Sequence, residues 1–485
     1  MIYHSTRGET HRVDSAQAVL EGLAPDGGLF VPEKIPYINV EACLQESTMD
    51  MAVRIISAML PDVEDMYALV EKAYRGKFQT EELTPTVPAG DFTVLELFRG
   101  PTSAFKDVAL CMLPQLLTKA RAQKGMEDEI LILTATSGDT GKAALSGFAD
   151  VPGVGICVFY PDGGVSTVQR AQMVTQEGSN VAVCAVRGNF DDAQTGVKNL
   201  FAAAENGKLP GDSRSLSTAN SINIGRLAPQ ITYYFKAYAD LLKRGTIKMG
   251  EKVNFSVPTG NFGDILAGFL AKRMGLPVGM LICASNANNV LTDFIRTGVY
   301  DRRRPLHKTI SPSMDILVSS NLERLLYFLS DGDTALVAGL MANLNKEGHY
   351  TLPESLKEAV SKEFWAGCCD DAGATETIRK VWKETGYLCD PHTATGWAVA
   401  EEYVQKTGDK APMVVLSTAS PYKFPAAVLS AIAEPESADE FAQMAQLEAL
   451  TGVPVPRNLQ GLQEKPERHT DVIDKEQMLA YVVRR

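Results

Sequence analysis

The 485-residue sequence predicts an α/β protein built on parallel β-sheets, and two observations support this prediction. From residue 128 onward, apolar runs rich in β-branched residues alternate with polar, glycine-containing loops and with segments of helical period. The apolar runs are nearly continuous, which is typical of strands buried on both faces of a parallel sheet. The composition, 45% hydrophobic and 22% charged, is that of a globular protein, and the length allows about two or three domains.

The strand, loop and helix pattern recurs in two clusters along the chain. The predicted strands of the first cluster are 129–135, 154–160 and 181–188. Those of the second cluster are 252–257, 278–286 and 412–418. A helical, glycine-poor stretch at 226–250 separates the clusters, and periodic segments predict a helical insertion at 310–388.

The charge balance limits the possible partners. With 47 basic and 59 acidic residues, the formal net charge is −12, which argues against a broad surface for nucleic acid or anionic membranes. No apolar run approaches the roughly 18 residues that span a bilayer, and the first residues lack an apolar signal core. We therefore expect a cytoplasmic protein with no nucleic-acid and no membrane partner, in which local donors hold any anionic ligand.

The eight cysteines are expected to be reduced. They form no CxxC pair and have no metal-ligand spacing with the six histidines, so no metal site is predicted. Cys157 and Cys184 lie inside apolar runs and are expected to be small buried side chains. This usage fits a reducing compartment such as the cytosol.

The loops that follow strands are the expected ligand-binding segments, because ligands of open α/β sheets bind at the carboxyl ends of the strands. The loop TSGDTG, residues 136–141, follows one strand and begins a helix, so its N–H groups and hydroxyls face any anion at that helix start. It is not a Walker A loop, since Thr136 and Ala143 stand where that motif needs Gly and Ser or Thr. Alternatively, Ser137, Asp139 and Thr140 only cap the helix.

The segment PTGNFGD, residues 258–264, repeats this arrangement after another strand. Gly260 and Gly263 allow the backbone to approach a ligand closely, as in a phosphate-binding loop. A tight turn without a ligand is the alternative. The carboxylate of Asp264 would repel a phosphate unless it pointed away.

Lys106, in GPTSAFKDVALCML, lies near the start of a predicted apolar helix. The helix dipole disfavours a cation there by about 0.3–1 kcal/mol and so lowers its pKa. A neutral amine is what Schiff-base chemistry requires. The alternative is an exposed lysine paired with Asp107.

Two further segments offer hydrogen-bond donors. In NSINIGR, residues 220–226, Arg226 could hold a carboxylate or phosphate by a two-point contact, unless the segment only starts a helix. In STASPYKF, residues 417–424, three hydroxyls follow a buried strand, and the alternative is a capped turn.

Together these segments resemble threonine synthase, a pyridoxal-phosphate enzyme of fold type II, the tryptophan synthase β-like class. The resemblance covers almost the whole chain and rests, in order, on MIYHSTRG, GLAPDGGLFVPEKIP, GPTSAFKD, TSGDTG, NSINIGR, PTGNFGD, DPHTATG and STASPYKFP. The order and spacing of these motifs make it specific. Many members have Asn at the position of Asp139, and the SGDTG form resembles a recognised branch of the family.

The resemblance implies two parallel-sheet α/β domains. Residues 1–97 are expected to form an N-terminal segment packed on the large domain, and residues 98–219 a smaller domain that carries Lys106 and the SGDTG loop. Residues 220–485 are expected to form the large cofactor-binding domain, with the helical insertion at 310–388.

The resemblance also implies residue roles. Lys106 would form the Schiff base with pyridoxal 5'-phosphate and then move protons. The implied cofactor-binding residues are Lys106, Asp139, Gly260, Asn261, Phe262, Gly263, Asp264 and Thr418. The implied substrate-binding residues are Thr136, Ser137, Thr140, Asn220, Ser221 and Arg226. A charged Asp139 beside the phenolic oxygen of the cofactor would be unfavourable, and His392 in DPHTATG is expected to be structural, although a proton relay stays open.

The implied reaction converts O-phospho-L-homoserine and water into L-threonine and phosphate, by γ-elimination and addition of water at the β carbon. Closure of the smaller domain would exclude water at the early steps. The protein is expected to be a monomer or homodimer without an S-adenosylmethionine site. The alternatives are a phospho-lyase that gives 2-oxobutyrate, phosphate and ammonia, and an inactive binding protein, against which the presence of Lys106 argues.

Overall fold

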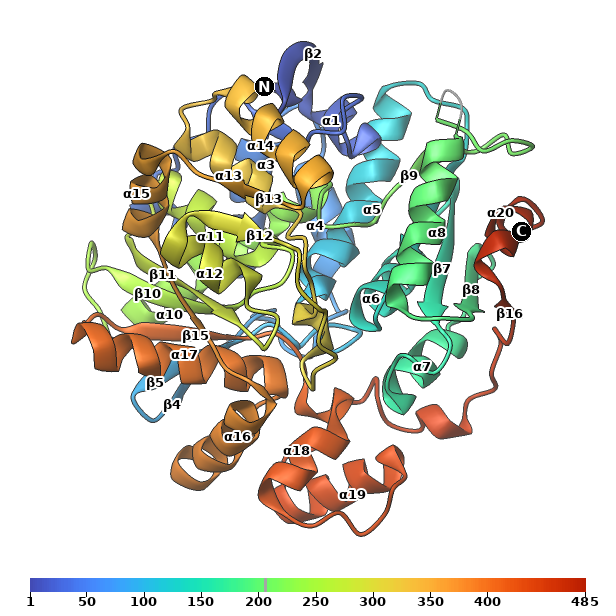
Figure 1. The fold of residues 1–485 in the computed structure, drawn as a ribbon. Helices are drawn as coiled ribbons and strands as arrows, with labels where there is room; N and C mark the ends of the chain where they lie inside the picture. The colour runs from blue at the N-terminus through green and yellow to red at the C-terminus, as the bar shows by residue number, and fades with distance from the viewer. Residues whose placement is uncertain (205–206) are drawn as a thin grey trace.

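Two parallel sheets organise the computed structural model, which describes residues 1–204 and 207–485 (Figure 1). The larger sheet has six strands in the order β14-β11-β10-β15-β5-β4, and its pairs are parallel except for that between β4 and β5. The smaller sheet has five strands in the order β16-β8-β7-β6-β9 and is parallel throughout. The expected α/β class with two parallel sheets is confirmed.

The strands of the large sheet are β4 (Thr86–Ala89), β5 (Phe92–Glu96), β10 (Val253–Pro258), β11 (Val278–Ser285), β14 (Phe364–Cys368) and β15 (Met413–Ser417). Those of the small sheet are β6 (Ile130–Ala135), β7 (Val154–Pro161), β8 (Val181–Val186), β9 (Ser215–Ser217) and β16 (Val472–Ile473). Two small antiparallel sheets contain β1 (Ile2–Ser5), β2 (Gly8–Asp14) and β3 (Phe30–Pro32), and β12 (Val299–Asp301) and β13 (His349–Thr351).

Helices surround both sheets. The first eight in the described residues are α1 (Ser15–Glu21), α2 (Val40–Cys43), α3 (Thr48–Met59), α4 (Met66–Tyr74), α5 (Lys106–Gln123), α6 (Asp139–Phe148), α7 (Thr167–Val174) and α8 (Phe190–Ala203). Next come α9 (Ile224–Leu227), η1 (Ala228–Gln230), α10 (Ile231–Lys243), α11 (Gly263–Arg273), α12 (Val290–Thr297), η2 (Pro312–Met314), α13 (Leu322–Leu329), α14 (Thr334–Glu347) and α15 (Glu354–Glu363). The last are α16 (Asp371–Thr385), α17 (Pro391–Thr407), η3 (Pro421–Lys423), α18 (Pro425–Ile432), α19 (Glu440–Thr451), η4 (Leu462–Glu464), η5 (Lys475–Gln477) and α20 (Met478–Val483).

Each sheet is buried on both faces, which explains the continuous apolar runs. In β6, Ile130 and Ile132 join one core, with residues of α6, whereas Leu131 and Leu133 join another, with residues of α8. In the large sheet, α10 and α11 share a core with one face, and α17 packs against the other. In Figure 1, α17 runs along the lower side of the large sheet and α8 lies over the small sheet. Cys157 and Cys184 are buried, as expected.

The chain crosses from one sheet to the other more than once. Strands β4 and β5, from the expected N-terminal segment 1–97, lie in the large sheet, and β16, from the C-terminal tail, extends the small sheet. Residues 310–388 contain α13 to α16, but also β14, which is an edge strand of the large sheet. The division at 97 and 219, with an insertion at 310–388, remains a proposal.

Helices α5 and α6 pack closely, and this contact positions two predicted site residues. Lys106 and Asp139 are the first residues of α5 and α6 respectively. Gly147, in the last turn of α6, lies so near α5 that a Cβ there would be 2.0 Å from the Leu110 carbonyl oxygen. Only a residue without a side chain allows this approach.

Substitution of Gly147 by alanine should therefore lower the free energy of unfolding by about 1–3 kcal/mol, the usual cost of overpacking. Chemical denaturation measures the change. Gly339→Ala, in the exposed face of α14 with no atom within 4 Å of the new Cβ, is the matched control. That control should leave the protein as stable as before or slightly more stable, since alanine favours helix. Equal stability of the two variants would contradict the packing argument.

Candidate active site

A cavity of about 600 Å³ opens between the two sheets, at the carboxyl ends of β6, β10 and β15. Ligands of open α/β sheets bind at this edge. The sequence-predicted residues that line it are Lys106, Thr136, Ser137, Thr140, Asn220, Ser221, Arg226, Gly260, Asn261, Phe262, Gly263, Asp264 and Thr418. Asp139, the remaining predicted residue, contacts Lys106 from beneath this lining. The structure thus brings the predicted residues together.

The position of Lys106 is set by the segment that follows β15. Ser103 has a left-handed backbone with φ of 60°, and Ala104 pairs with Ala419 in an antiparallel bridge. The Phe105 N–H donates to the Thr418 carbonyl oxygen at 2.8 Å. These contacts hold the start of α5 against the large sheet, so that Lys106 projects into the cavity.

The ε-amine of Lys106 is buried among polar groups. Its Nζ donates to Ser313 Oγ at 3.2 Å and lies 3.7 Å from Asp139 Oδ2. Burial lowers the pKa of Lys106 to about 8, and although Asp139 opposes this shift, the charges of Lys423 and Arg226 reinforce it. An appreciable fraction of the amine is therefore neutral near physiological pH, which Schiff-base chemistry requires.

The alternative of an exposed Lys106 paired with Asp107 is wrong. Lys106 is only 8% exposed. Asp107 instead accepts hydrogen bonds from the hydroxyl and the N–H of Thr102, at 2.5 and 2.8 Å. Asp107 thus stabilises the turn that precedes α5.

Asp139 is an ionised carboxylate held from several sides. Its Oδ1 lies 2.5 Å from Lys423 Nζ and accepts from Gln169 Nε2 at 3.0 Å, and its Oδ2 accepts from Ser313 Oγ at 3.3 Å. Burial by itself would raise the pKa of Asp139. The charges of Lys423 and Lys106 outweigh burial and hold that pKa well below its usual range.

Lys423 and Ser313 are site residues that the sequence analysis missed. Lys423 lies within the predicted segment 417–424, but an isolated lysine usually predicts a solvated side chain. Ser313, in η2, is 207 positions from Lys106 and has no local motif. Only the folded structure brings both residues to Asp139.

His392 accepts a hydrogen bond from the Ser313 N–H at Nε2, at 3.2 Å. Its proton therefore lies on Nδ1, which donates to Asp390 Oδ2 at 2.6 Å. Asp390 is also the N-cap of α17, and both side chains are buried. His392 thus contacts η2, and it also lines the cavity, so the structural role and the proton relay both stay predictions.

The loop at 260–263 is shaped for a ligand that approaches its backbone. Phe262 adopts a left-handed conformation with φ of 64°, an uncommon and costly one outside glycine that is typical of functional sites. It is the N-cap of α11 but makes no side-chain cap hydrogen bond within the described residues. The first N–H groups of α11 are therefore free to bind an anion. A Cβ on Gly260 would be 2.7 Å from the Ser313 carbonyl oxygen, so glycine is required there.

Asp264 is directed towards helix α10 by two tyrosines. Its Oδ1 accepts from the hydroxyls of Tyr233 and Tyr234, at 2.5 and 3.1 Å. Burial raises the pKa of Asp264 to about 6, although both tyrosine hydrogen bonds oppose this shift. These contacts turn one carboxylate oxygen away from the loop, which reduces the repulsion of a phosphate.

Thr136 supports the start of α6. Its Oγ1 accepts from the N–H groups of Gly138 and Gly141, at 3.0 and 2.8 Å. Gly138 has φ of 133°, and a Cβ there would be 2.4 Å from the Gln169 side chain. Thr136, which the capping alternative did not include, thus accepts the N–H groups at the helix start, whereas Ser137 and Thr140 line the cavity.

Arg226 is a buried cation without a carboxylate partner within residues 1–204 and 207–485. Its Nη1 donates to the Ala219 carbonyl oxygen at 2.8 Å, and its Nε is buried with no hydrogen-bond partner among the described residues. Burial lowers the pKa of Arg226 to about 10. An uncompensated buried charge is costly, so an anion that entered the cavity would stabilise this guanidinium.

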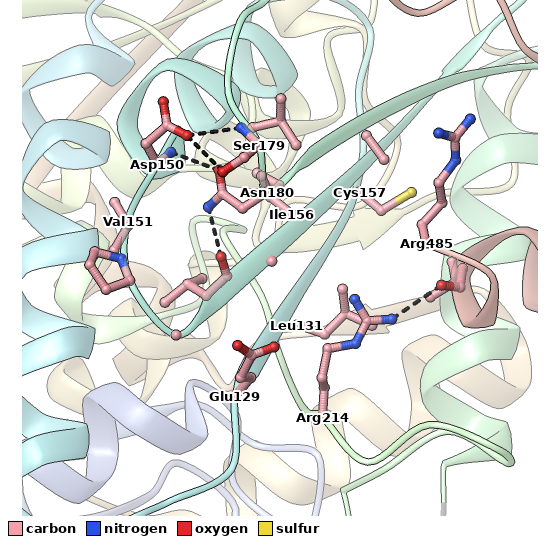
Figure 2. Close-up of a pocket in the computed structure, with 17 residues that line it drawn as sticks. Glu129, Leu131, Asp150, Val151, Ile156, Cys157, Ser179, Asn180, Arg214 and Arg485 are labelled. Atoms are coloured by element: carbon pink, nitrogen blue, oxygen red, sulfur yellow. Dashed lines mark hydrogen bonds between the residues drawn. The ribbon is translucent and has the colours of Figure 1, made fainter.

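A second cavity, of about 520 Å³, lies at the opposite, amino-terminal edge of the small sheet. Figure 2 shows Arg214 and Arg485 on one side of it and Asp150 with Ser179 on the other. Arg214 is already paired with Asp212 at 2.5 Å, and Asp150 accepts from the Ser179 N–H at 2.8 Å. The cavity at Lys106 is therefore the better candidate active site.

Comparison with known proteins identifies the family. The model described as Threonine synthase N terminus matches residues 2–74, and that described as Threonine synthase, C-terminal, matches residues 393–482. The threonine synthase of Pseudomonas aeruginosa is 40% identical over 481 residues, which is 97% of this chain and 95% of that protein. The chain belongs to the threonine synthase family. The threonine synthase of Saccharomyces cerevisiae is 38% identical over 467 residues, 89% of each chain.

Solved structures of this family confirm the fold. The pyridoxal-phosphate-bound threonine synthase of Brucella melitensis has a TM-score of 0.88 and 39% identity, with coverage of 100% of this chain and 99% of that one. Human threonine synthase-like 1 is 39% identical over 434 residues, and this chain spans only 58% of its length.

Within residues 1–204 and 207–485, none of the helices is long and apolar enough to cross a membrane. The same residues contain no cluster of His, Cys, Asp or Glu suited to a metal ion.

Proposed function

We propose that this threonine synthase family member binds pyridoxal 5'-phosphate at Lys106 and converts O-phospho-L-homoserine and water into L-threonine and phosphate. One observation supports this proposal above the others. A single cavity combines a buried lysine of lowered pKa, the uncapped start of a helix and a buried guanidinium without a carboxylate partner among the described residues. The lysine matches the aldehyde of the cofactor, and the helix start matches its phosphate. The guanidinium matches an anionic group of the substrate.

The residues present fit the cofactor. Loop 260–263 and the free first turn of α11 would hold the cofactor phosphate, and the Thr418 hydroxyl would face the pyridine nitrogen. Asp139 would lie by the phenolic oxygen and Asp264 behind the phosphate loop. The chemistry that bound pyridoxal phosphate supplies is an electron sink for the charge left when a proton is removed from the substrate.

Lys106 has the properties of the group that moves protons. With the substrate amine in its place, the neutral ε-amine would be free within the cavity and would accept the α proton. Once Lys106 has delivered that proton elsewhere in the site, its amine is neutral again and would accept a β proton. The hydrogen bond to Ser313 and the contact with Asp139 keep Nζ oriented. The side chain can then return a proton to the product.

Two groups of residues would hold the substrate anions. Arg226 supplies the charge, and Asn220 and Ser221 lie on the same segment of the cavity wall. The other neutral donors, on the small domain, are Thr136, Ser137 and Thr140. Because the cavity lies between the two sheets, closure of the smaller domain would bring both groups onto one ligand and exclude water.

The pH dependence of cofactor attachment tests the Lys106 environment. The pKa of Lys106 is lowered to about 8 from 10.5, so the reactive neutral amine should accumulate as the pH rises through about 8. The rate of attachment of pyridoxal phosphate to the apoprotein, followed by stopped-flow absorbance, should rise with a midpoint near that pH. A midpoint near 10.5 would show that Lys106 is solvated.

Product analysis tests the proposed activity against the phospho-lyase alternative. Purified protein with pyridoxal phosphate and O-phospho-L-homoserine should release threonine and phosphate in equal amounts. Formation of 2-oxobutyrate and ammonia without threonine would contradict the proposal.

A cytoplasmic location and a monomeric or homodimeric state are further proposals, testable by fractionation and sedimentation.

A further inference from the structure

We propose that Lys423 is a positioning residue that holds Asp139 as an ionised carboxylate beside the reactive nitrogen of Lys106. This inference rests on the proposed function, because it assigns Lys423 a role at the site where Lys106 would join the cofactor. Lys423 does not line the cavity itself and would act through Asp139.

The geometry places Lys423 out of contact with solvent. Its side chain is fully buried, and its Nζ lies 2.5 Å from Asp139 Oδ1 and donates to the Thr102 carbonyl oxygen at 3.2 Å. It sits at the end of η3, whose start is capped by the hydroxyl of Ser420. The backbone of Ser420 in turn donates to the Ser103 carbonyl oxygen at 3.1 Å. Lys423 is thus held rigidly on the segment that also positions the start of α5.

The charges around Asp139 show what Lys423 contributes. Lys106 from α5 and Lys423 from η3 face this carboxylate with positive charges, and His392 from α17 lies near it as the tautomer that accepts a hydrogen bond at Nε2. Asp107 and Lys142 also face Lys423, but Asp107 is bound to Thr102 rather than to a lysine. Asp139 therefore contacts two buried lysines, and in the proposed function only Lys106 joins the cofactor and moves protons.

The second lysine has a specific electrostatic consequence. Without Lys423, the negative charge of Asp139 would act on Lys106 alone and would favour a proton on its nitrogen. With Lys423, the carboxylate is already neutralised and can orient Lys106 without making that nitrogen too basic. Lys423 would also keep Asp139 paired if the phenolic oxygen of the cofactor lies beside it, where an uncompensated carboxylate would be unfavourable.

A cycle of variants tests this role through a spectroscopic midpoint rather than activity. The lysine-bound cofactor has a visible absorbance band that changes as the Lys106 nitrogen gains or loses a proton, so its pH midpoint can be titrated. In Lys423→Met the midpoint should rise by about one pH unit or more, the usual effect of a nearby charge. In Asp139→Asn it should fall, because the Lys423 charge is then unopposed. The double variant should return towards wild type, and Lys423→Arg should stay close to it.

Lys236→Met is the matched control for loss of a buried lysine. Lys236 is 6% exposed and pairs with Asp240 at 2.6 Å in α10, but it does not line the cavity. Its midpoint should equal that of wild type. An unmoved midpoint in Lys423→Met would overturn the inference.

If Lys423→Met does not fold, the comparison between Asp139→Asn and the double variant decides. A higher midpoint in the double variant supports the inference, and an equal midpoint overturns it. A wild-type chain that shows no lysine-bound cofactor band would overturn the proposed function and this inference with it. A wild type with the band but insensitive to Lys423 would overturn the inference alone.

Discussion

Replacement of Lys106 by alanine is expected to lower the rate of threonine formation by about 10³-fold or more, because one side chain supplies both the covalent attachment and the proton transfers. Phosphate release and threonine formation measure the rate. Borohydride reduction followed by peptide mass analysis should find the cofactor on Lys106 in wild type and on no peptide of the variant.

Lys142→Ala is the matched control for this substitution. Lys142 lies in α6, and burial lowers its pKa to about 8, as it does for Lys106. However, Lys142 does not line the cavity, and its Nζ donates to Gln176 Oε1. The control should keep the cofactor linkage, since position as well as basicity selects Lys106. A Lys106→Ala protein that retains a reducible linkage elsewhere would refute the assignment.

Arg226→Met should weaken substrate binding by about 2–4 kcal/mol, which is roughly 30- to 1,000-fold, because a charge-assisted contact in a buried site is lost. Steady-state kinetics with O-phospho-L-homoserine would show the change mainly in KM. The stability of the ligand-free protein should not fall in the same way, because the variant also removes a buried charge that has no carboxylate partner among the described residues.

Arg324→Met provides the contrast to Arg226→Met. Arg324 is equally buried, but it donates to the carbonyl oxygens of Phe30 and Ile222 and to Asn321 Oδ1. Its loss should lower the free energy of unfolding by several kcal/mol, about 3–5 by the usual cost of breaking a buried polar network. Unchanged kinetics in Arg226→Met would remove Arg226 from the site.

The sequence was sufficient to predict the fold class and most of the cavity, for a physical reason. Strands buried on both faces need continuous apolar runs, such as 130–135, and the loops after them must meet at one edge of the sheet. Polar, glycine-rich loops at that edge are therefore candidate ligand-binding loops without knowledge of the tertiary contacts, and the resemblance to threonine synthase assigns their roles. The loop at 260–263 is found in this way.

Features that depend on contacts between distant segments could not be predicted in the same way. Strand β14 falls between α15 and α16 in the sequence, and its five residues, FWAGC, are too few to predict a strand from their pattern. Its pairing with β11 makes it part of the large sheet. Strand β16 has only two residues, and it is recognisable as a strand only because it pairs with β8. Lys423 and Ser313 acquire their roles only when η3 and η2 meet the start of α6 at Asp139.

The fate of oxygen in isotopically labelled water tests the central claim most directly. If the cavity at Lys106 performs γ-elimination and then adds water at the β carbon, the bond between carbon and the ester oxygen breaks. The label should then appear in the hydroxyl of threonine, and the released phosphate should contain none. Two results would contradict the account. One is labelled phosphate together with homoserine, which is the outcome of hydrolysis at phosphorus, and the other is unlabelled phosphate together with 2-oxobutyrate in place of threonine.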